Sequence, residues 1–120
     1  MGWDAYAFGI KRDWIKKRLR DPVLDKTFKE AEDFVRTAAG TVDGYLRLGG
    51  LDVSSCGRML EKATGESCWV DGWSSDVVQR LNRTANWKFK YNEDEYWAYL
   101  SAKTFLECCA KHNLEITFSF

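Results

Sequence analysis

A chain of 120 residues matches the usual size of one domain, so residues 1–120 are expected to form a single domain. Hydrophobic residues make up 45% and charged residues 30% of the sequence, which excludes an intrinsically disordered chain. The 18 basic and 18 acidic residues cancel, so no field of the whole molecule attracts nucleic acid or a membrane surface.

The N-terminal part of the sequence predicts a strand followed by a basic helix. Residues 3–10 are aromatic or small, with no charge after Asp4, which is typical of an inner strand with two apolar faces. Residues 11–20 have a narrow apolar face that indicates a short helix. This helix must stop before Pro22, because proline disfavours the helical conformation in the residue before it. The charged residues of the segment are Lys11, Arg12, Lys16, Lys17, Arg18 and Arg20 against Asp13 alone.

The clearest helix signal in the chain begins at Asp21. This residue is expected to be the N-cap, and Pro22 takes the first helical position, where its missing N–H costs no hydrogen bond. Gly40 supplies the C-terminal stop. Between them, one apolar stripe at helical spacing consists of Leu24, Phe28, Ala31, Val35 and Ala38.

The middle of the chain predicts two more helices. Residues 41–51 are ambiguous, because glycines interrupt the segment and one Asp-Gly pair could close a small hairpin. An apolar stripe predicts a helix over 52–64, which Gly65 ends. After a loop over 68–72, Ser74 is expected to cap a short helix that runs to about residue 85.

The last third of the chain predicts two strands that flank a long helix. Residues 87–91 alternate strictly between aromatic side chains and lysines, which is a strand signature. Asn92 and Glu95 have the spacing of a capping box, so a helix is expected from here to about residue 111, apolar on most sides. Residues 114–120 alternate again and predict a half-buried strand.

Together these segments predict an α+β fold that is mostly helical, with four to five helices packed on a small sheet of about three strands. The three strands are residues 3–10, 87–91 and 114–120. Lysines on the second strand could oppose Glu115 on the third. The order and direction of the strands stay open.

Cysteine placement and the absence of targeting segments indicate the compartment. The first residues lack the basic region and apolar run of a secretory signal, and no stretch approaches ~20 uninterrupted apolar residues. Cys108 and Cys109 are adjacent in a predicted helix, which is poor geometry for pairing with each other. We therefore expect reduced thiols, a cytoplasmic protein and no membrane association.

A metal site or a cysteine nucleophile is a weak hypothesis for this sequence. Cys108 and His112 are four residues apart in a helix and could both reach one zinc ion. However, a thiol near a helix C-terminus faces the negative end of the helix dipole, which raises its pKa and disfavours nucleophilic catalysis. Because no catalytic motif is present either, no metal, cofactor or catalytic residue is expected. A small enzyme or zinc protein around these two residues is the second alternative.

Nucleic-acid binding is the first alternative function. Two basic clusters support this alternative, one at residues 11–20 and one at 80–90. The second cluster contains no Asp or Glu. The residues of the second cluster are Arg80, Arg83, Lys88 and Lys90. Aromatic residues alternate with these lysines, but on a strand the two kinds of side chain point to opposite sides. The aromatic rings are then expected to belong to the core rather than to a stacking platform.

Protein recognition is the leading hypothesis. The chain contains six tryptophans and 15% aromatic residues, and tryptophan, tyrosine and arginine are favoured anchors of protein interfaces. Trp3, Trp69 and Trp73 lie near a chain end or in a loop, where some exposure is expected. The predicted contact residues are Trp69, Trp73, Lys16, Lys17 and Arg18. The alternative for the tryptophans is that they cover the open ends of the sheet, and pairing of two copies of the chain is a further alternative.

The opening Met-Gly-Trp-Asp-Ala-Tyr-Ala of residues 1–7 resembles the start of many small proteins of phages and mobile elements. This resemblance implies a small intracellular accessory protein, and many proteins of that kind bind and inhibit a host factor. It carries over no site residue. The function expected from the sequence is therefore a non-enzymatic binding module, an inhibitor or adaptor that contacts a host protein.

Overall fold

The computed structural model describes residues 3–11, 43–48 and 53–120. Lys11, the first residue of the helix expected over 11–20, belongs to a strand instead; the rest of that helix and the helix expected from Asp21 to Gly40 lie outside these residues. The same holds for the basic residues Lys16, Lys17 and Arg18.

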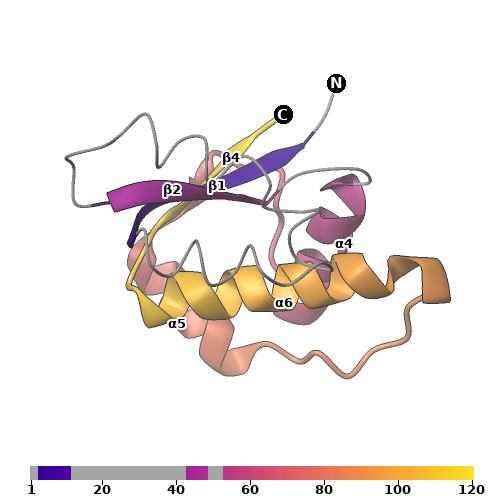
Figure 1. The fold of residues 1–120 in the computed structure, drawn as a ribbon. Helices are drawn as coiled ribbons and strands as arrows, with labels where there is room; N and C mark the ends of the chain where they lie inside the picture. The colour runs from indigo at the N-terminus through magenta and orange to yellow at the C-terminus, as the bar shows by residue number, and fades with distance from the viewer. Residues whose placement is uncertain (1–2, 12–42, 49–52) are drawn as a thin grey trace.

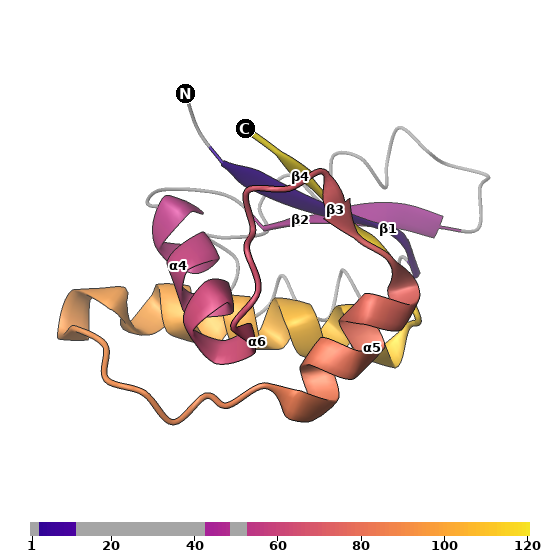
Figure 2. The same ribbon diagram turned by 180° about the vertical axis from the view of Figure 1, so that it is seen from behind.

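A sheet and a layer of helices make up the described part of the chain (Figures 1 and 2). The helices lie on one side of the sheet, and the segment that joins α5 to α6 passes below α6 in both views. The strands are β1 (Asp4–Lys11), β2 (Asp43–Leu48), β3 (Gly72–Trp73) and β4 (Ile116–Ser119). The helices are α4 (Val53–Thr64), α5 (Ser75–Thr84) and α6 (Tyr96–Lys111), with a short 3-10 turn η1 (Glu93–Glu95) before α6.

The sheet is antiparallel, in the order β2-β1-β4-β3. The strand β1 is therefore an inner strand, as its two apolar faces predict. Ala5 lies opposite Leu48 on one side and Phe118 on the other. Along β4 buried and exposed residues alternate, because side chains on a strand point to opposite faces. The buried set packs toward the helices and includes Ala5, Ala7, Ile116 and Phe118.

The predictions for α4 and α5 are confirmed. α4 ends at Thr64, and Gly65 follows with a φ of 73°, a left-handed conformation that glycine adopts without strain. Ser74 is the N-cap of α5, and its side chain accepts a hydrogen bond from the backbone N–H of Val77.

The long C-terminal helix is also found where the pattern predicts it. The backbone N–H of Asn92 donates to Glu95 Oε1 at 3.0 Å, so the capping interaction is present, although the first three residues form the 3-10 turn η1. The helix α6 ends at Lys111, His112 is its C-cap, and Asn113 follows with a φ of 59°. Its buried residues are Ala98, Ser101, Ala102, Phe105, Leu106, Cys108, Cys109 and Ala110.

The fold class needs two corrections, although the mixture of helices and sheet is as expected. The described residues contain three α-helices, so the expected count of four to five is wrong there. Residues 87–91 are not a strand. Both edges of β4 are already occupied, by β1 and β3, so lysines of this segment do not lie opposite Glu115 in a sheet.

The two edge strands of the sheet, β2 and β3, are segments that the sequence leaves ambiguous or assigns to a loop. The Asp-Gly pair at 43–44 does not turn the chain but begins β2, where Asp43 lies opposite Lys11 of β1. Gly72 and Trp73 form β3 against Thr117 and Ile116. Within the described ranges, no helix is both long and apolar enough to cross a membrane.

Candidate functional site

The four cysteines form no disulfide, are buried, and belong to one core cluster. Burial raises the pKa of Cys109 far above its ordinary value, and the neighbouring Cys108 raises it further. Burial also raises the pKa of Cys68, with a second contribution from the carboxylate of Glu61. A buried thiol that holds its proton is a poor nucleophile, so Cys68 and Cys109 act as small hydrophobic residues of the core.

The residue pair considered for zinc lies at the end of α6. His112 is the C-cap of this helix, and its backbone N–H donates to the carbonyl oxygen of Cys108 at 3.0 Å. In the part of the chain that the structure describes, no three His, Cys, Asp or Glu residues are grouped closely enough to hold a metal ion.

The expected exposure of the tryptophans is wrong for Trp3 and Trp73, which are both buried. The Trp3 indole N–H donates to the carbonyl oxygen of Cys68 at 2.8 Å, and its ring stacks on Phe118 with the centroids 5.4 Å apart. Trp73 packs edge-on against the same phenylalanine at 5.0 Å. Its position opposite Ile116 in the sheet turns the indole into the core, so Trp73 cannot contact a partner in this conformation.

Trp69 is exposed, and it is the centre of an apolar surface that we call the loop patch: Trp69, Val70 and Phe120. These side chains are 55%, 41% and 56% exposed. The rings of Trp69 and Phe120 meet edge to face, with their centroids 5.3 Å apart. The patch thus joins the loop before β3 to the residue that follows β4.

Hydrogen bonds hold the loop that carries the patch. The backbone N–H of Cys68 donates to Glu61 Oε2 at 2.9 Å, and the backbone N–H of Trp69 donates to Ser67 Oγ at 3.1 Å. On the far side of the loop, the backbone N–H of Phe118 donates to the carbonyl oxygen of Asp71 at 2.9 Å. The exposed indole is therefore carried on a backbone that is fixed at both ends.

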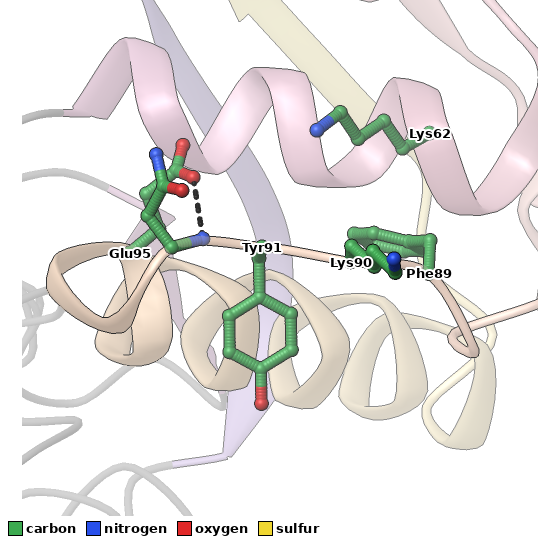
Figure 3. Close-up of a pocket in the computed structure, with 6 residues that line it drawn as sticks. Lys62, Phe89, Lys90, Tyr91 and Glu95 are labelled. Carbon is green, nitrogen blue, oxygen red and sulfur yellow. Dashed lines mark hydrogen bonds between the residues drawn. The ribbon is translucent and has the colours of Figure 1, made fainter.

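A second surface lies along residues 87–91, which we call the aromatic segment. It has no regular secondary structure, and it runs between α4 and α6 in the view of Figure 3. Its tyrosine, Tyr91, stacks on Tyr99 of α6 with the ring centroids 4.3 Å apart and an interplanar angle of 18°. Tyr91 is 36% exposed and Tyr96, in the first turn of α6, is 50% exposed. Aromatic pairs at centroid distances of 5.6 to 6.5 Å extend the cluster through Trp87 and Phe89.

Polar contacts fix the backbone of the aromatic segment at several points. The hydroxyl of Tyr99 donates to the carbonyl oxygen of Trp87 at 2.8 Å. Just before the segment, the backbone N–H of Asn86 donates to the carbonyl oxygen of Ala63 in α4 at 2.9 Å. The side chain of Asn86 accepts the backbone N–H of Lys88 at 2.9 Å. These bonds replace the ladder bonds that a strand would make.

A groove of about 460 Å³ lies between α4 and the aromatic segment (Figure 3). Lys62 of α4 has its Nζ 5.8 Å from the centroid of the Phe89 ring. The Tyr91 ring points away from α4 (Figure 3). At the other end, Glu95 forms an ion pair with Arg58 at 3.1 Å. The lining residues are Lys62, Phe89, Lys90, Tyr91, Asn92 and Glu95.

The four basic residues of the 80–90 cluster are all exposed. Arg80 and Arg83 lie on α5, and Arg80 is 4.0 Å from the carboxylate of Glu66. Lys88 and Lys90 lie on the aromatic segment, so the structure brings these two together with the stacked rings.

Sequence reasoning placed Val70 in the candidate contact loop but missed several other residues of the two surfaces, namely Phe120, Lys62, Tyr96 and Tyr99. Only the last two had a detectable signal, because tyrosines three apart in a helix share a face. Lys62 reaches the groove from a distant element, and no sequence pattern relates α4 to the aromatic segment.

Comparisons with protein-family models, with curated proteins and with solved structures found no match for this chain. A function is therefore argued from the chemistry of the two surfaces.

Proposed function

We propose that this chain is a non-enzymatic binding module of the cytoplasm, an inhibitor or adaptor that contacts a host protein through the loop patch. The observation that supports the proposal is the exposure of three large apolar side chains, 55%, 41% and 56%, on one loop and the residue after β4, with the rings of Trp69 and Phe120 in contact. Contiguous exposed apolar surface of this kind is typical of protein interaction sites.

The energetics of the patch favour an anchoring role. Tryptophan is enriched among the residues that dominate interface energies, because it buries a large ring and keeps one hydrogen-bond donor. The loop of the patch is held by hydrogen bonds at Cys68, Trp69 and Asp71, so binding immobilises little additional backbone. We expect the partner to offer an apolar pocket for the indole.

The proposal also includes the basic residues Lys16, Lys17 and Arg18, which lie outside the described residues. Only the composition supports a role for them, since six of the ten residues 11–20 are lysine or arginine. Trp73 is buried and is therefore not part of the proposed contact surface.

The test is a comparison of matched variants in affinity capture from a lysate of the source organism, treated with nuclease. The patch variant is Trp69→Ser/Phe120→Ser, and the control is Tyr96→Ser, which removes an equally exposed ring from the other surface. The captured protein is then purified, and its affinity for each variant is measured by calorimetry.

We expect the patch variant to lose about 30-fold or more in affinity, the effect of removing an interface hot spot of ~2 kcal/mol. The control should bind as the unmodified chain does. A patch variant that keeps its circular dichroism spectrum and still binds with unchanged affinity would contradict the proposal. A Lys16→Glu/Lys17→Glu/Arg18→Glu variant tests the basic residues in the same assay, and sedimentation of the purified chain shows whether the patch instead pairs two copies.

A further inference from the structure

The aromatic segment combines exposed rings with cations on a part of the surface that the loop patch does not use. We propose that this segment, with the adjoining start of α6, binds single-stranded nucleic acid. In this arrangement, bases stack on the exposed tyrosines Tyr91 and Tyr96, and phosphates lie along Lys62, Lys88 and Lys90. This inference goes beyond the proposed function and does not depend on it.

The rings form a supported stacking platform. Tyr91 stacks on Tyr99 at 4.3 Å, so one part of its ring is fixed by α6 while 36% of the residue remains exposed. Tyr96 lies 6.3 Å from Tyr91, tilted by 33°, and is half exposed. Bases of any sequence stack on such rings, because every base has a π face.

The cations lie beside the rings rather than behind a strand. Because the segment is not part of the sheet, Lys88, Lys90 and the ring of Tyr91 are all exposed, whereas Trp87 and Phe89 are partly buried. A nucleotide also directs its base and its phosphate away from each other, so a strand that follows the segment can use both sides. Lys88 and Lys90 are exposed on the segment, and Lys62 faces it from α4.

The nearby carboxylates limit where the strand can run. Glu95 lines the groove but is paired with Arg58 at 3.1 Å, which compensates its charge. Glu93 and Asp94 are exposed at the end of the segment and repel phosphate. Residues 80–92 contain no acid, so the strand is expected to run from the segment toward α5, where Arg80 and Arg83 lie.

Unpaired bases are required because stacking on a side chain needs an accessible base face. A duplex hides these faces in its own stack and would meet only the cations. The hydrogen bonds at Asn86 and Tyr99 fix the segment before binding, which lowers the entropy cost of ordering it.

The experiment measures fluorescence anisotropy of a labelled 12-nucleotide oligothymidylate titrated with the full chain. Thymidine monophosphate and a duplex of the same length are tested as competitors. With phosphate contacts from the three lysines alone, the logarithm of affinity should fall with the logarithm of salt concentration at a slope of about −2, which is about a 20-fold loss between 50 and 200 mM. Contacts with Arg80 and Arg83 would make the slope steeper. The oligonucleotide should bind more tightly than the duplex and far more tightly than the mononucleotide.

Two pairs of variants separate charge from stacking. Lys88→Gln/Lys90→Gln should reduce the salt slope by about 1.4, whereas Lys111→Gln, an exposed lysine at the end of α6, should leave it unchanged. Tyr91→Ser should lower affinity about 5-fold to 150-fold, the range for one lost stacking contact, and Tyr91→Phe should restore it. Circular dichroism confirms that each variant is folded.

Several outcomes would overturn the proposal. These are absence of oligonucleotide binding at 50 mM salt, equal competition by the duplex or the mononucleotide, and equal effects of the Lys88→Gln/Lys90→Gln and Lys111→Gln variants. The loop-patch variant Trp69→Ser/Phe120→Ser should bind the oligonucleotide like the unmodified chain. Failure of one surface is thereby distinguished from failure of the other.

Discussion

Gly65 and Gly72 resist substitution for different physical reasons. Gly65 has a φ of 73°, where a side chain is strained, but a Cβ there would meet no atom within 4 Å. At Gly72, by contrast, a Cβ would lie 2.3 Å from the carbonyl oxygen of Ile116, the residue next to its partner in the neighbouring strand. Gly65 is thus required by its left-handed backbone conformation, and Gly72 by the lack of room for a side chain between β3 and β4.

We predict that Gly72→Ala lowers the free energy of unfolding by about 1–3 kcal/mol, because β3 must move away from β4 to accept the methyl group. Gly65→Ala should cost about 1–2 kcal/mol, and Gly65→Asn should recover part of that loss because asparagine tolerates the left-handed conformation. Urea denaturation of the purified variants measures all three. A Gly72→Ala variant as stable as the unmodified chain would show that the close approach of β3 to β4 is absent.

Trp69 and Trp73 show why residue-scale exposure could not be predicted from the sequence. Both are in one short aromatic loop, yet Trp69 is exposed and Trp73 is buried. The difference arises because Trp73 belongs to β3, a strand of two residues, whose register places it opposite Ile116. Two residues are too few to show the alternation by which a strand is recognised.

At the scale of elements, local signals were sufficient where the stabilising contacts are local. The helices α4 and α5 and the capping interaction before α6 depend on residues within one or two turns, such as Ser74, Glu95 and Gly65, and these were predicted. For the aromatic segment the sequence predicts a strand, whereas the structure shows no strand there. Its alternation does reflect an extended backbone with rings on one side, but those rings pack on Tyr99 of a helix rather than on a sheet.

The hydroxyl of Tyr99 is expected to hold the aromatic segment against α6. Tyr99→Phe keeps the ring that stacks on Tyr91 but removes the hydrogen bond to the carbonyl oxygen of Trp87. We predict a loss of about 1 kcal/mol in unfolding free energy. The backbone amides of Asn86 and Lys88 should also exchange with deuterium faster, because their hydrogen bonds hold the same stretch.

Tyr96→Phe is the matched control for that experiment, since it removes a hydroxyl from a half-exposed tyrosine on the same helix. It should change neither the stability nor the exchange of these amides. Equal effects of the two substitutions would mean that the segment is held by its ring contacts and not by the Tyr99 hydroxyl.

At the scale of the whole molecule, the arrangement of the sheet lay beyond the sequence pattern. The strands β1 and β4 come from opposite ends of the chain and pair through Ala5 and Phe118, with β2 and β3 on the outer sides. Alternation identifies a strand but says nothing about its neighbour, so the partners of residues 3–10 and 114–120 had to stay open. The position of Lys62 beside the aromatic segment follows from this global packing and has no local signal.

The rates at which the cysteine thiols react with a reagent measure how cooperatively the core opens. They come from α4, the loop before β3 and α6, yet all four are buried in one core cluster. Burial raises the pKa of Cys68 and Cys109, so little thiolate forms near pH 8, and a reagent can reach the sulfur atoms only when the core opens.

We therefore predict that Ellman's reagent at pH 8 modifies the folded chain at least ~1000-fold more slowly than free cysteine, because the open state of a domain with ordinary stability is rarer than one in a thousand. All four thiols should then react in a single kinetic phase, and all four should react at once in guanidinium chloride. If one thiol reacts early, a Cys68→Ala variant will show whether it belongs to the loop of the loop patch. Early reaction of Cys68 alone would mean that this loop opens independently of the sheet and helices, and the patch would then not be preorganised for binding.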